Sequence, residues 1–298
     1  MALINVLLFT LFWSLQIFIS KLGFLHGAQL VPFSLQSSII ILLLVCAYLF
    51  SFKLKEFKKV TKDTAIKLFW ASALHAGIGG FLSTAAVLYT TAINVAFLFQ
   101  FTTVTTPLFA WVLLKEKMTK SKVITIILVM IGMFLFITKG KLITPHLGDI
   151  LALSACIAWS LGNVLIRGIL KRHPVDADVS TFYRGIGGLS FLFLFILLSP
   201  LYPSSLNTIF HVNYFDTHAF LYVLLNSLFV VLLWIFLNRS LKVASASYMT
   251  LMSSLSPLVV AVLSFTFLHE TLVGIQVLGA GLIIFGGLIT HYLKMDKH

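Results

Sequence analysis

The feature that most constrains this chain is a stretch of 47 residues, 68–114, that contains no Asp, Glu, Lys or Arg. A helix that crosses a lipid bilayer needs about 20 apolar residues, so this stretch is too long for one crossing and right for two. Over all 298 residues, 59% are hydrophobic and 10% are charged. A soluble domain carries roughly 25% charged residues, and this chain could not cover its apolar surface in water. We therefore expect an all-α integral membrane protein.

We expect ten transmembrane helices, placed by the apolar runs and the turn residues between them. The charge-free stretch supplies two of these helices, with a turn near residues 91–94. The other eight are expected at 3–25, 31–52, 123–138, 148–170, 179–198, 219–238, 243–268 and 272–293. The first segment has no basic start and no small-residue cleavage site, so we do not expect it to be a removed signal peptide.

The positions of Lys and Arg predict the orientation, because cytoplasmic loops carry an excess of these residues. With a cytoplasmic N-terminus, the cytoplasmic loops and the C-terminus hold 17 of the 21, and the outer loops hold only Lys21, Lys139 and Lys141. We therefore expect a multi-pass protein of the cytoplasmic membrane with both ends in the cytoplasm. The net charge of +12 then reflects this topology, and we expect no nucleic acid as a partner.

Several residue pairs repeat along the chain and divide it into two halves. The pairs are Trp13 and Trp159, Ser14 and Ser160, Lys21 and Arg167, Pro107 and Pro257, Glu116 and Glu270, and Gly132 and Gly286. We expect two five-helix domains, 1–143 and 144–298. Because five is odd, the two repeats must be inverted in the membrane, an arrangement that lets secondary transporters open a central site to alternate sides. The alternative is a duplication kept for a scaffold or a membrane enzyme.

Trp13 and Trp159 are expected near the middle of their helices, although Trp prefers the membrane interface, where its N–H is hydrated. We expect them to form the wall of a substrate cavity; the alternative is helix packing, with the serines that follow them as close-approach residues. Polar residues within other apolar runs complete the expected substrate-binding set: Gln16, Gln100, Asn163, Asn226 and Tyr248. A buried amide is costly unless it is hydrogen-bonded, so some of these could instead hold helices together.

Pro107 and Pro257 are expected near mid-depth in the fourth and ninth helices. Proline removes a helical hydrogen bond, and the Ser and Thr residues before each one can satisfy the freed backbone groups. We expect the two prolines to act as hinges, with a static kink as the alternative. The spacing from proline to the following glutamate is nine residues in one half and thirteen in the other, about one helical turn apart.

Two ionisable residues lie inside expected spans. Arg184 would contact an anionic substrate group, or would extend to the cytoplasmic interface, which is the less costly option for a charge in lipid. His75 titrates in the physiological range and would carry a coupling proton, or would be a neutral histidine hydrogen-bonded within the bundle. We expect no metal site, no catalytic constellation and no cofactor, and Cys46 and Cys156 show neither metal-ligand nor disulfide spacing.

The motif Leu114-Lys115-Glu116 recurs as Leu268-His269-Glu270, in register with the repeated tryptophans, prolines and glycines. Together these motifs resemble the EamA-like members of the drug/metabolite transporter superfamily over nearly the whole chain. The resemblance implies a central cavity between two halves, and uptake or efflux of small metabolites. The chain departs from strict symmetry where Tyr183-Arg184 in the second half stands for Gln36-Ser37 in the first.

The sequence favours a secondary transporter of small metabolites, such as amino acids or related compounds, that works by alternating access and exports its substrate. The alternative is a flippase for a lipid-linked substrate, or a membrane scaffold for a partner enzyme. A membrane enzyme is the weakest reading, because no catalytic constellation stands out. We expect a monomer or a homodimer in the lipid bilayer.

The expected cavity role of Trp159 gives a direct prediction. Trp159→Ala should abolish transport while the protein still folds, because the substrate loses an aromatic surface on which to stack. Flux in proteoliposomes, with size-exclusion chromatography as the folding control, measures both. Flux at the level of the natural protein in this variant would contradict the role.

Overall fold

The structure is a computed structural model, and it describes residues 2–138, 146–202, 210, 212–214, 216–292. These residues form helices and loops with no strand. The main elements are α1 (Ala2–Leu25), α2 (Leu30–Phe52), α3 (Leu54–Phe57), α4 (Lys62–Ser72), η1 (Ala73–Gly79), α5 (Gly80–Tyr89), α6 (Ala92–Leu98), η2 (Phe99–Phe101), α7 (Thr102–Leu114), α8 (Lys120–Thr138), α9 (Leu147–Arg172), α10 (Val179–Leu197), η3 (Ser199–Leu201), α12 (Phe220–Val243), α13 (Ala246–Met252), η4 (Ser253–Leu255), α14 (Ser256–Phe267) and α15 (Gly274–Tyr292).

Within the described residues, eight helical runs are long and apolar enough to cross a membrane. They correspond to eight of the ten expected segments, and Gly274–Gly286 is a shorter apolar helix at the tenth. The fifth expected segment is the helix α8. The prediction of an all-α membrane protein is therefore confirmed for the described part of the chain, while the count of ten crossings stays a prediction.

Several boundaries differ from the sequence prediction, and the two largest differences, at the start of α4 and the end of α12, arise because charged residues continue the helices beyond the apolar runs. α4 begins at Lys62, where the Thr61 hydroxyl caps the helix by accepting a hydrogen bond from the Thr64 N–H. α12 continues to Val243, and Lys242 in its last turn suits the negative end of the helix dipole. The sequence prediction ends a helix where charged residues begin, but Lys62 and Lys242 lie in the terminal turns of helices.

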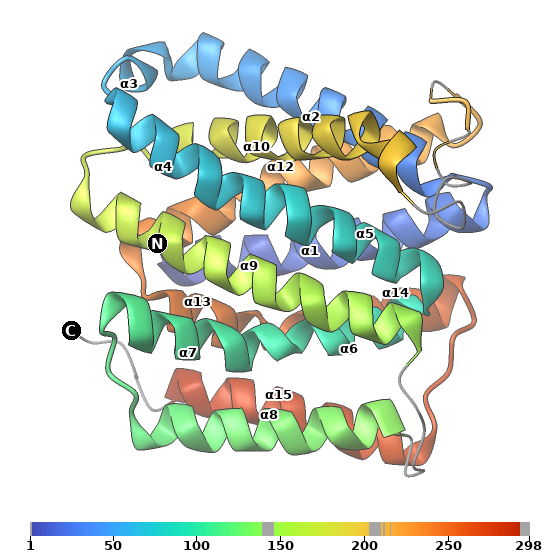
Figure 1. Cartoon of the computed structure of the whole chain (residues 1–298). Helices are drawn as coiled ribbons and strands as arrows, with labels where there is room; N and C mark the ends of the chain where they lie inside the picture. The colour runs from blue at the N-terminus through green and yellow to red at the C-terminus, as the bar shows by residue number, and fades with distance from the viewer. Residues whose placement is uncertain (1, 139–145, 203–209, 211, 215, 293–298) are drawn as a thin grey trace.

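The helices lie side by side with their long axes nearly aligned, and α8 and α15 pack against each other at one edge (Figure 1). The start of α1, the end of α2, the start of α8 and the end of α9 lie at the end of the bundle that carries α3 (the α3 end). The lysine-rich loop at 53–62 is at this end. The predicted outer lysines Lys139 and Lys141 lie outside the described residues.

Two of the long runs are interrupted at matching positions. The run 92–114 contains the three-residue 3₁₀ segment η2, and the run 246–267 contains the 3₁₀ segment η4. The first residues of the two breaks, Phe99 and Ser253, lie 154 residues apart, the same offset as Glu116 and Glu270. The prolines occupy different turns: Pro107 lies inside α7 and Pro257 lies in the first turn of α14.

Each run ends in a residue with a left-handed backbone followed by a glutamate. Lys115 has φ 56° and His269 has φ 53°, and they are the two described non-glycine residues with positive φ. The next N–H donates to a carbonyl six residues back: Glu116 to Ala110 at 3.2 Å and Glu270 to Ser264 at 3.3 Å. A left-handed residue followed by a backward hydrogen bond resembles the Schellman motif, but here the donor lies six residues past the acceptor, one more than in that motif. The conformation is retained although a left-handed non-glycine residue costs roughly 1–2 kcal/mol.

The Glu270 carboxylate caps the first interrupted run. Its two oxygens accept hydrogen bonds from the backbone N–H groups of Ala92 at 3.0 Å and Ile93 at 2.9 Å, at the start of α6. Helix N-termini leave N–H groups without intrahelical partners and attract negative charge. A residue of the second half therefore completes a helix of the first.

The Glu116 carboxylate makes the reciprocal cap at the start of α13. Its oxygens accept from the Ala246 N–H at 3.4 Å and from the Ser247 hydroxyl at 2.9 Å. Both glutamates lie directly after the end of a helical run, and the exchange of caps between the halves could not be read from the sequence.

The other repeated pairs also make matching contacts. Ser14 on α1 lies 2.9 Å from the Ser256 hydroxyl, next to Pro257, and the Ser160 hydroxyl on α9 accepts from Thr106, next to Pro107, at 2.8 Å. In each case a serine that follows the repeated tryptophan contacts the residue before the proline of the other half.

The cation pair makes equivalent contacts within each half. Lys21 donates to the carbonyls of Val87 and Thr90 at the end of α5. Arg167 donates to the carbonyls of Leu241 and Lys242 at the end of α12. Both cations therefore neutralise helix C-terminal carbonyls, where positive charge is stabilising.

Glycines allow the closest helix crossings. A Cβ on Gly132 of α8 would lie 2.6 Å from the Gly279 carbonyl oxygen of α15, and a Cβ on Gly279 would lie 2.5 Å from the Gly132 oxygen. Further along, the Thr125 hydroxyl donates to the Gly286 carbonyl at 3.1 Å. As α8 advances from 125 to 132, its contact on α15 moves back from 286 to 279, so the two helices are antiparallel.

We predict that Glu270→Ala destabilises the protein by about 1–3 kcal/mol, because two N–H groups at the start of α6 lose their acceptor in an apolar setting. Thermal unfolding of the purified protein in detergent measures this. Glu56→Ala is the control, because Glu56 forms an exposed ion pair with Lys59, and such pairs contribute little. Equal unfolding temperatures for the two variants would contradict the capping role.

Candidate functional site in the centre of the bundle

A cavity of about 130 Å³ lies in the middle of the bundle. Its described lining comes from both predicted halves: from α1, α2, η1, α5 and α7 of the first, and from α9, α10, α12, α13 and η4 of the second. None of the described lining residues is Asp, Glu, Lys or Arg. The volume is large enough for several water molecules or a small organic molecule.

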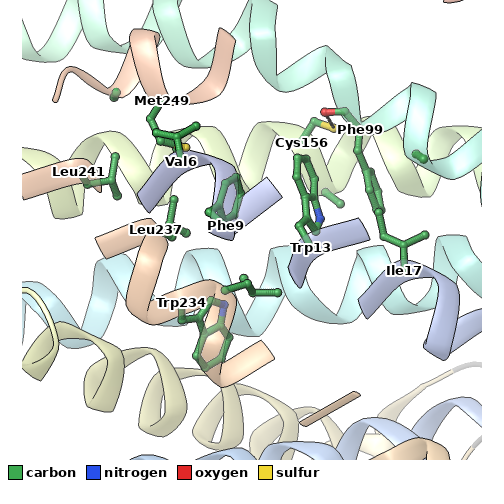
Figure 2. Packing of buried hydrophobic residues seen from close by; sticks show 14 of the residues in the cluster. Val6, Phe9, Trp13, Ile17, Phe99, Cys156, Trp234, Leu237, Leu241 and Met249 are labelled. Atoms are coloured by element: carbon green, nitrogen blue, oxygen red, sulfur yellow. Dashed lines mark hydrogen bonds between the residues drawn. The ribbon is translucent and has the colours of Figure 1, made fainter. Parts of the chain in front are cut away.

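One wall of the cavity is aromatic. The Trp13 ring is stacked between Phe9 at 5.4 Å and Phe99 at 6.0 Å, and it meets Trp159 edge-on at 5.9 Å. Figure 2 shows Trp13 and Phe99 side by side, with Cys156 next to them. Trp159 also packs against Gly79, where a Cβ would lie 2.5 Å from the indole ring. The two tryptophans predicted from the repeat therefore meet, and both line the cavity.

A row of amides and hydroxyls forms another wall. Gln16 Nε2 donates to Asn226 Oδ1 at 3.1 Å, and the Ser20 hydroxyl donates to the same oxygen at 2.9 Å. Asn226 Nδ2 in turn donates to the Ser37 hydroxyl at 3.1 Å. This network joins α1, α12 and α2, so Gln16 and Asn226 both line the cavity and hold helices together.

His75 lines the cavity from η1, a π-helical segment in the middle of the third long run. π-Helical segments are rare in proteins, and those that occur are frequently found at functional sites. The His75 ring lies 6.2 Å from Trp159, it is buried, and its Nδ1 has no hydrogen-bond partner among the described residues. The segment packs closely on α9, since a Cβ on Gly162 would lie 2.6 Å from the His75 Cβ.

Arg184 lies next to the cavity without lining it. Its Nε donates to Asn238 Oδ1 at 3.0 Å, and its Nη2 donates to Asn163 Oδ1 at 2.9 Å. The side chain is 0% exposed. The alternative that Arg184 extends to the membrane interface is therefore wrong, because the side chain is held inward by two amides.

The remaining predicted residues are elsewhere. Gln100 is fully buried in η2, where its Nε2 lies 3.5 Å from the Ala96 carbonyl. Tyr248 lies in the first turn of α13, and its N–H donates to the Ser245 hydroxyl at 3.0 Å. Neither residue lines the cavity, and neither do Pro107 and Pro257.

The sequence reasoning missed most of the hydroxyl groups around the cavity. The described hydroxyl-bearing lining residues are Ser34, Ser37, Ser38, Ser83, Thr84, Thr102, Thr106 and Ser253. Serine and threonine occur in any membrane helix because they can bond to their own backbone. They carry no signal of a site by themselves. Thr102 directly follows η2 and Ser253 is the first residue of η4, so both lie at the 3₁₀ breaks without occupying equivalent positions in the repeat.

An ionic network lies at the α3 end. Arg239 donates to both carboxylate oxygens of Asp178 at 2.7 Å, and the Tyr48 hydroxyl donates to Asp178 at 2.8 Å. Lys53 adds an ion pair with Asp176 at 3.0 Å. The network joins α2, α10 and α12, and Asp178 is 2% exposed. It links these helices to one another at that end.

The network also shifts the pKa values of its members outside the helical spans. Burial by itself would raise the pKa of the Asp178 carboxyl, but the hydrogen bonds from Arg239 and Tyr48 and the nearby positive charges hold it below its ordinary value. The hydrogen bond to Asp176 raises the pKa of Lys53. Both groups are therefore charged at neutral pH.

A model of the EamA-like transporter family matches the chain twice, at residues 1–138 and 146–292. The chain belongs to the EamA-like transporter family. This confirms the resemblance drawn from the repeated motifs, and it makes the protein a multi-pass membrane protein of a family of transporters. The two matches leave only the connection at 139–145 between them.

Two further comparisons agree with the family. The uncharacterized transporter YyaM of Bacillus subtilis (strain 168) is 30% identical over 219 residues, 71% of this chain and 69% of YyaM. A crystal structure of another protein superposes with a TM-score of 0.70 at 15% identity, over 98% of this EamA-like chain and 96% of the other. The structural likeness supports the fold alone.

The described lining of the cavity offers groups that can bind a ligand. In the described part of the chain no group of three His, Cys, Asp or Glu residues is placed to hold a metal ion. The cavity combines aromatic faces, which stack on flat apolar groups, with amides and hydroxyls that can both donate and accept hydrogen bonds. This composition suits a small molecule with an apolar part and a polar part.

We predict that Asp178→Asn loosens the α3 end. Hydrogen–deuterium exchange should become faster in the first turn of α10 and the last turn of α12, because Arg239 loses its counter-ion. Asp63→Asn is the matched control, because Asp63 pairs with Lys67 on the surface, and this variant should leave exchange in both turns unchanged.

The same measurement has a pH dependence with a defined sign. The pKa of Asp178 is lowered in the folded protein, so the network is fully present above the ordinary Asp value of about 4 and is lost as the pH falls through the lowered value. Protection of these turns that already declined between pH 7 and pH 5 would contradict the network.

Proposed function

We propose that this protein is a secondary transporter that carries small amphipathic metabolites, amino acids or related compounds, across the cytoplasmic membrane by alternating access, with export as the net direction. The observation that carries the proposal is the central cavity, to which five elements of each half contribute. A site placed between two halves becomes accessible from either side when one half rocks against the other.

The proposed architecture is ten transmembrane helices in two inverted five-helix repeats, domains 1–143 and 144–298. Three observations support it. Glu116 and Glu270 exchange caps between the halves, Ser14 and Ser160 make matching contacts beside the prolines, and α8 and α15 cross in antiparallel fashion. When each residue is replaced by its counterpart in the other half, the same set of contacts results. A two-fold axis in the membrane plane requires this.

The orientation we propose has both chain ends in the cytoplasm. The lysine-rich loop before α4 lies at the α3 end, where α1 starts and α15 ends. An excess of Lys and Arg is typical of cytoplasmic loops. In this orientation the ionic network of Asp178 lies on the cytoplasmic side, where it would have to break for that side to open.

Within this proposal the predicted residues take different roles. Trp13, Gln16, Trp159, Asn163 and Asn226 would contact the substrate directly, since all five line the cavity. Gln100 and Tyr248 lie in the interrupted runs, and Pro107 and Pro257 would act as hinges of these runs. His75 is the candidate for a coupling proton, because it is a titratable side chain facing the cavity with an unpartnered ring nitrogen.

The test is efflux from proteoliposomes loaded with a mixed pool of amino acids and related metabolites, read by mass spectrometry with and without a pH gradient. We expect selective loss of one compound class, abolished in Trp159→Ala. Acceleration by the gradient that disappears in His75→Asn would assign proton coupling to His75. No flux of any compound from folded protein would contradict the proposal and favour a lipid-linked substrate or a scaffold role.

A further inference from the structure

Transport by itself does not explain why Arg184 is held by neutral amides inside the bundle. Arg184 is a fully buried cation whose described hydrogen-bond partners are two neutral amides, Asn163 and Asn238. Its Nη1 has no partner, and no Asp or Glu of the described residues lies within 4 Å of it. The Asp178 carboxylate, six residues earlier on the same helix, is already paired with Arg239.

An arrangement of this kind is costly for stability. A buried charge without a counter-ion is destabilising in a protein interior, and more so at membrane depth. Amide oxygens satisfy donors but do not neutralise the charge. The second amide is moreover fixed in place, because Asn238 Nδ2 donates to the Thr181 hydroxyl at 3.1 Å, which directs its oxygen at Arg184. The protein therefore holds this charge in position without cancelling it.

Arg184 lies directly behind the lining of the cavity. On α10 the lining residues are Gly185, Gly188 and Leu192, and Arg184 stands one turn before Gly188 on the same face. On α9 its partner Asn163 itself lines the cavity. A group bound in the cavity needs only to displace the Asn163 carboxamide to reach the guanidinium.

The aromatic wall is at a suitable distance from Arg184. Asn163 follows Trp159 by four residues on α9, a rise of about 6 Å along the helix. A molecule that stacks its ring on Trp159 would place a polar group one or two bonds beyond the ring near Arg184. The guanidinium binds carboxylates through paired hydrogen bonds, and Nη1 is still available for one of them.

We propose that the cavity binds amphipathic carboxylates, with the ring or apolar part against Trp13 and Trp159 and the carboxylate on Arg184. The bound carboxylate supplies the counter-ion that the folded chain lacks. This inference rests on the proposed function and names its substrate class.

The test uses two pairs of ligands of the same shape, phenylacetate with phenylacetamide and indole-3-acetate with indole-3-acetamide. Binding to the purified full-length protein is measured by calorimetry and thermal shift. We expect each acid to bind at least roughly tenfold more tightly than its amide, as a charge-assisted bidentate contact provides. Equal affinities within both pairs would overturn the inference.

Three variants separate binding from folding. Arg184→Met should remove the preference for the acid and leave the unfolding temperature of the free protein unchanged or higher, because an unneutralised charge is gone. Asn163→Asp places a carboxylate beside the guanidinium, so it should raise the unfolding temperature and abolish the preference for the acid. Arg172→Gln removes an exposed positive charge from α9 and should keep the preference.

The outcomes are distinct. A preference for the acid that survives in Arg184→Met overturns the inference, and if that variant does not fold, Asn163→Asp decides in its place. Flux of neutral compounds without any acid preference would leave transport intact and refute the substrate class. Acid preference in binding without flux of any compound would refute transport and leave the anion site standing.

Discussion

The fold depends on two carboxylates that each complete a helix of the other half. Glu270 accepts two N–H groups at the start of α6, and Glu116 accepts one N–H group and the Ser247 hydroxyl at the start of α13. Unsatisfied N–H groups at helix starts are costly in an apolar setting, so the position of each interrupted run is fixed by the half to which it does not belong. Once these runs are fixed, η2 and η4 lie in the centre of the bundle, and Thr102 and Ser253 beside them reach the cavity.

Neutral polar groups and charged groups occupy different places in and around the cavity. The lining itself is neutral and rich in aromatic, amide and hydroxyl groups, while the nearest cation, Arg184, is one layer deeper. A cation paired with a carboxylate is found instead at the α3 end, where Asp178 forms an ion pair with Arg239. The ionic network at that end links three helices, whereas the uncompensated cation behind the cavity lining favours an occupant with negative charge.

Apolar runs predicted the helices well, because membrane length and hydrophobicity leave few alternatives. The predicted boundaries failed where Lys62 and Lys242 continue helices beyond the bilayer core. The repeat correctly singled out Trp13 and Trp159, whose rings meet, but the π-helical segment around His75 has no sequence signature. Gln100 illustrates the remaining limit: an amide in an apolar run has the same cost whether it faces a cavity or the interior, and only the packing of neighbouring helices decides.

The exchange of caps has a consequence for how such a chain could be divided. Either half made as a separate polypeptide would contain one interrupted helix with an open start and one glutamate with nothing to cap. If the two different halves were produced in the same cell, each could supply the glutamate that caps the open helix start of the other. Two copies of one half inserted in the same direction could not do so. Complementation by split chains is therefore a consequence of the exchanged caps.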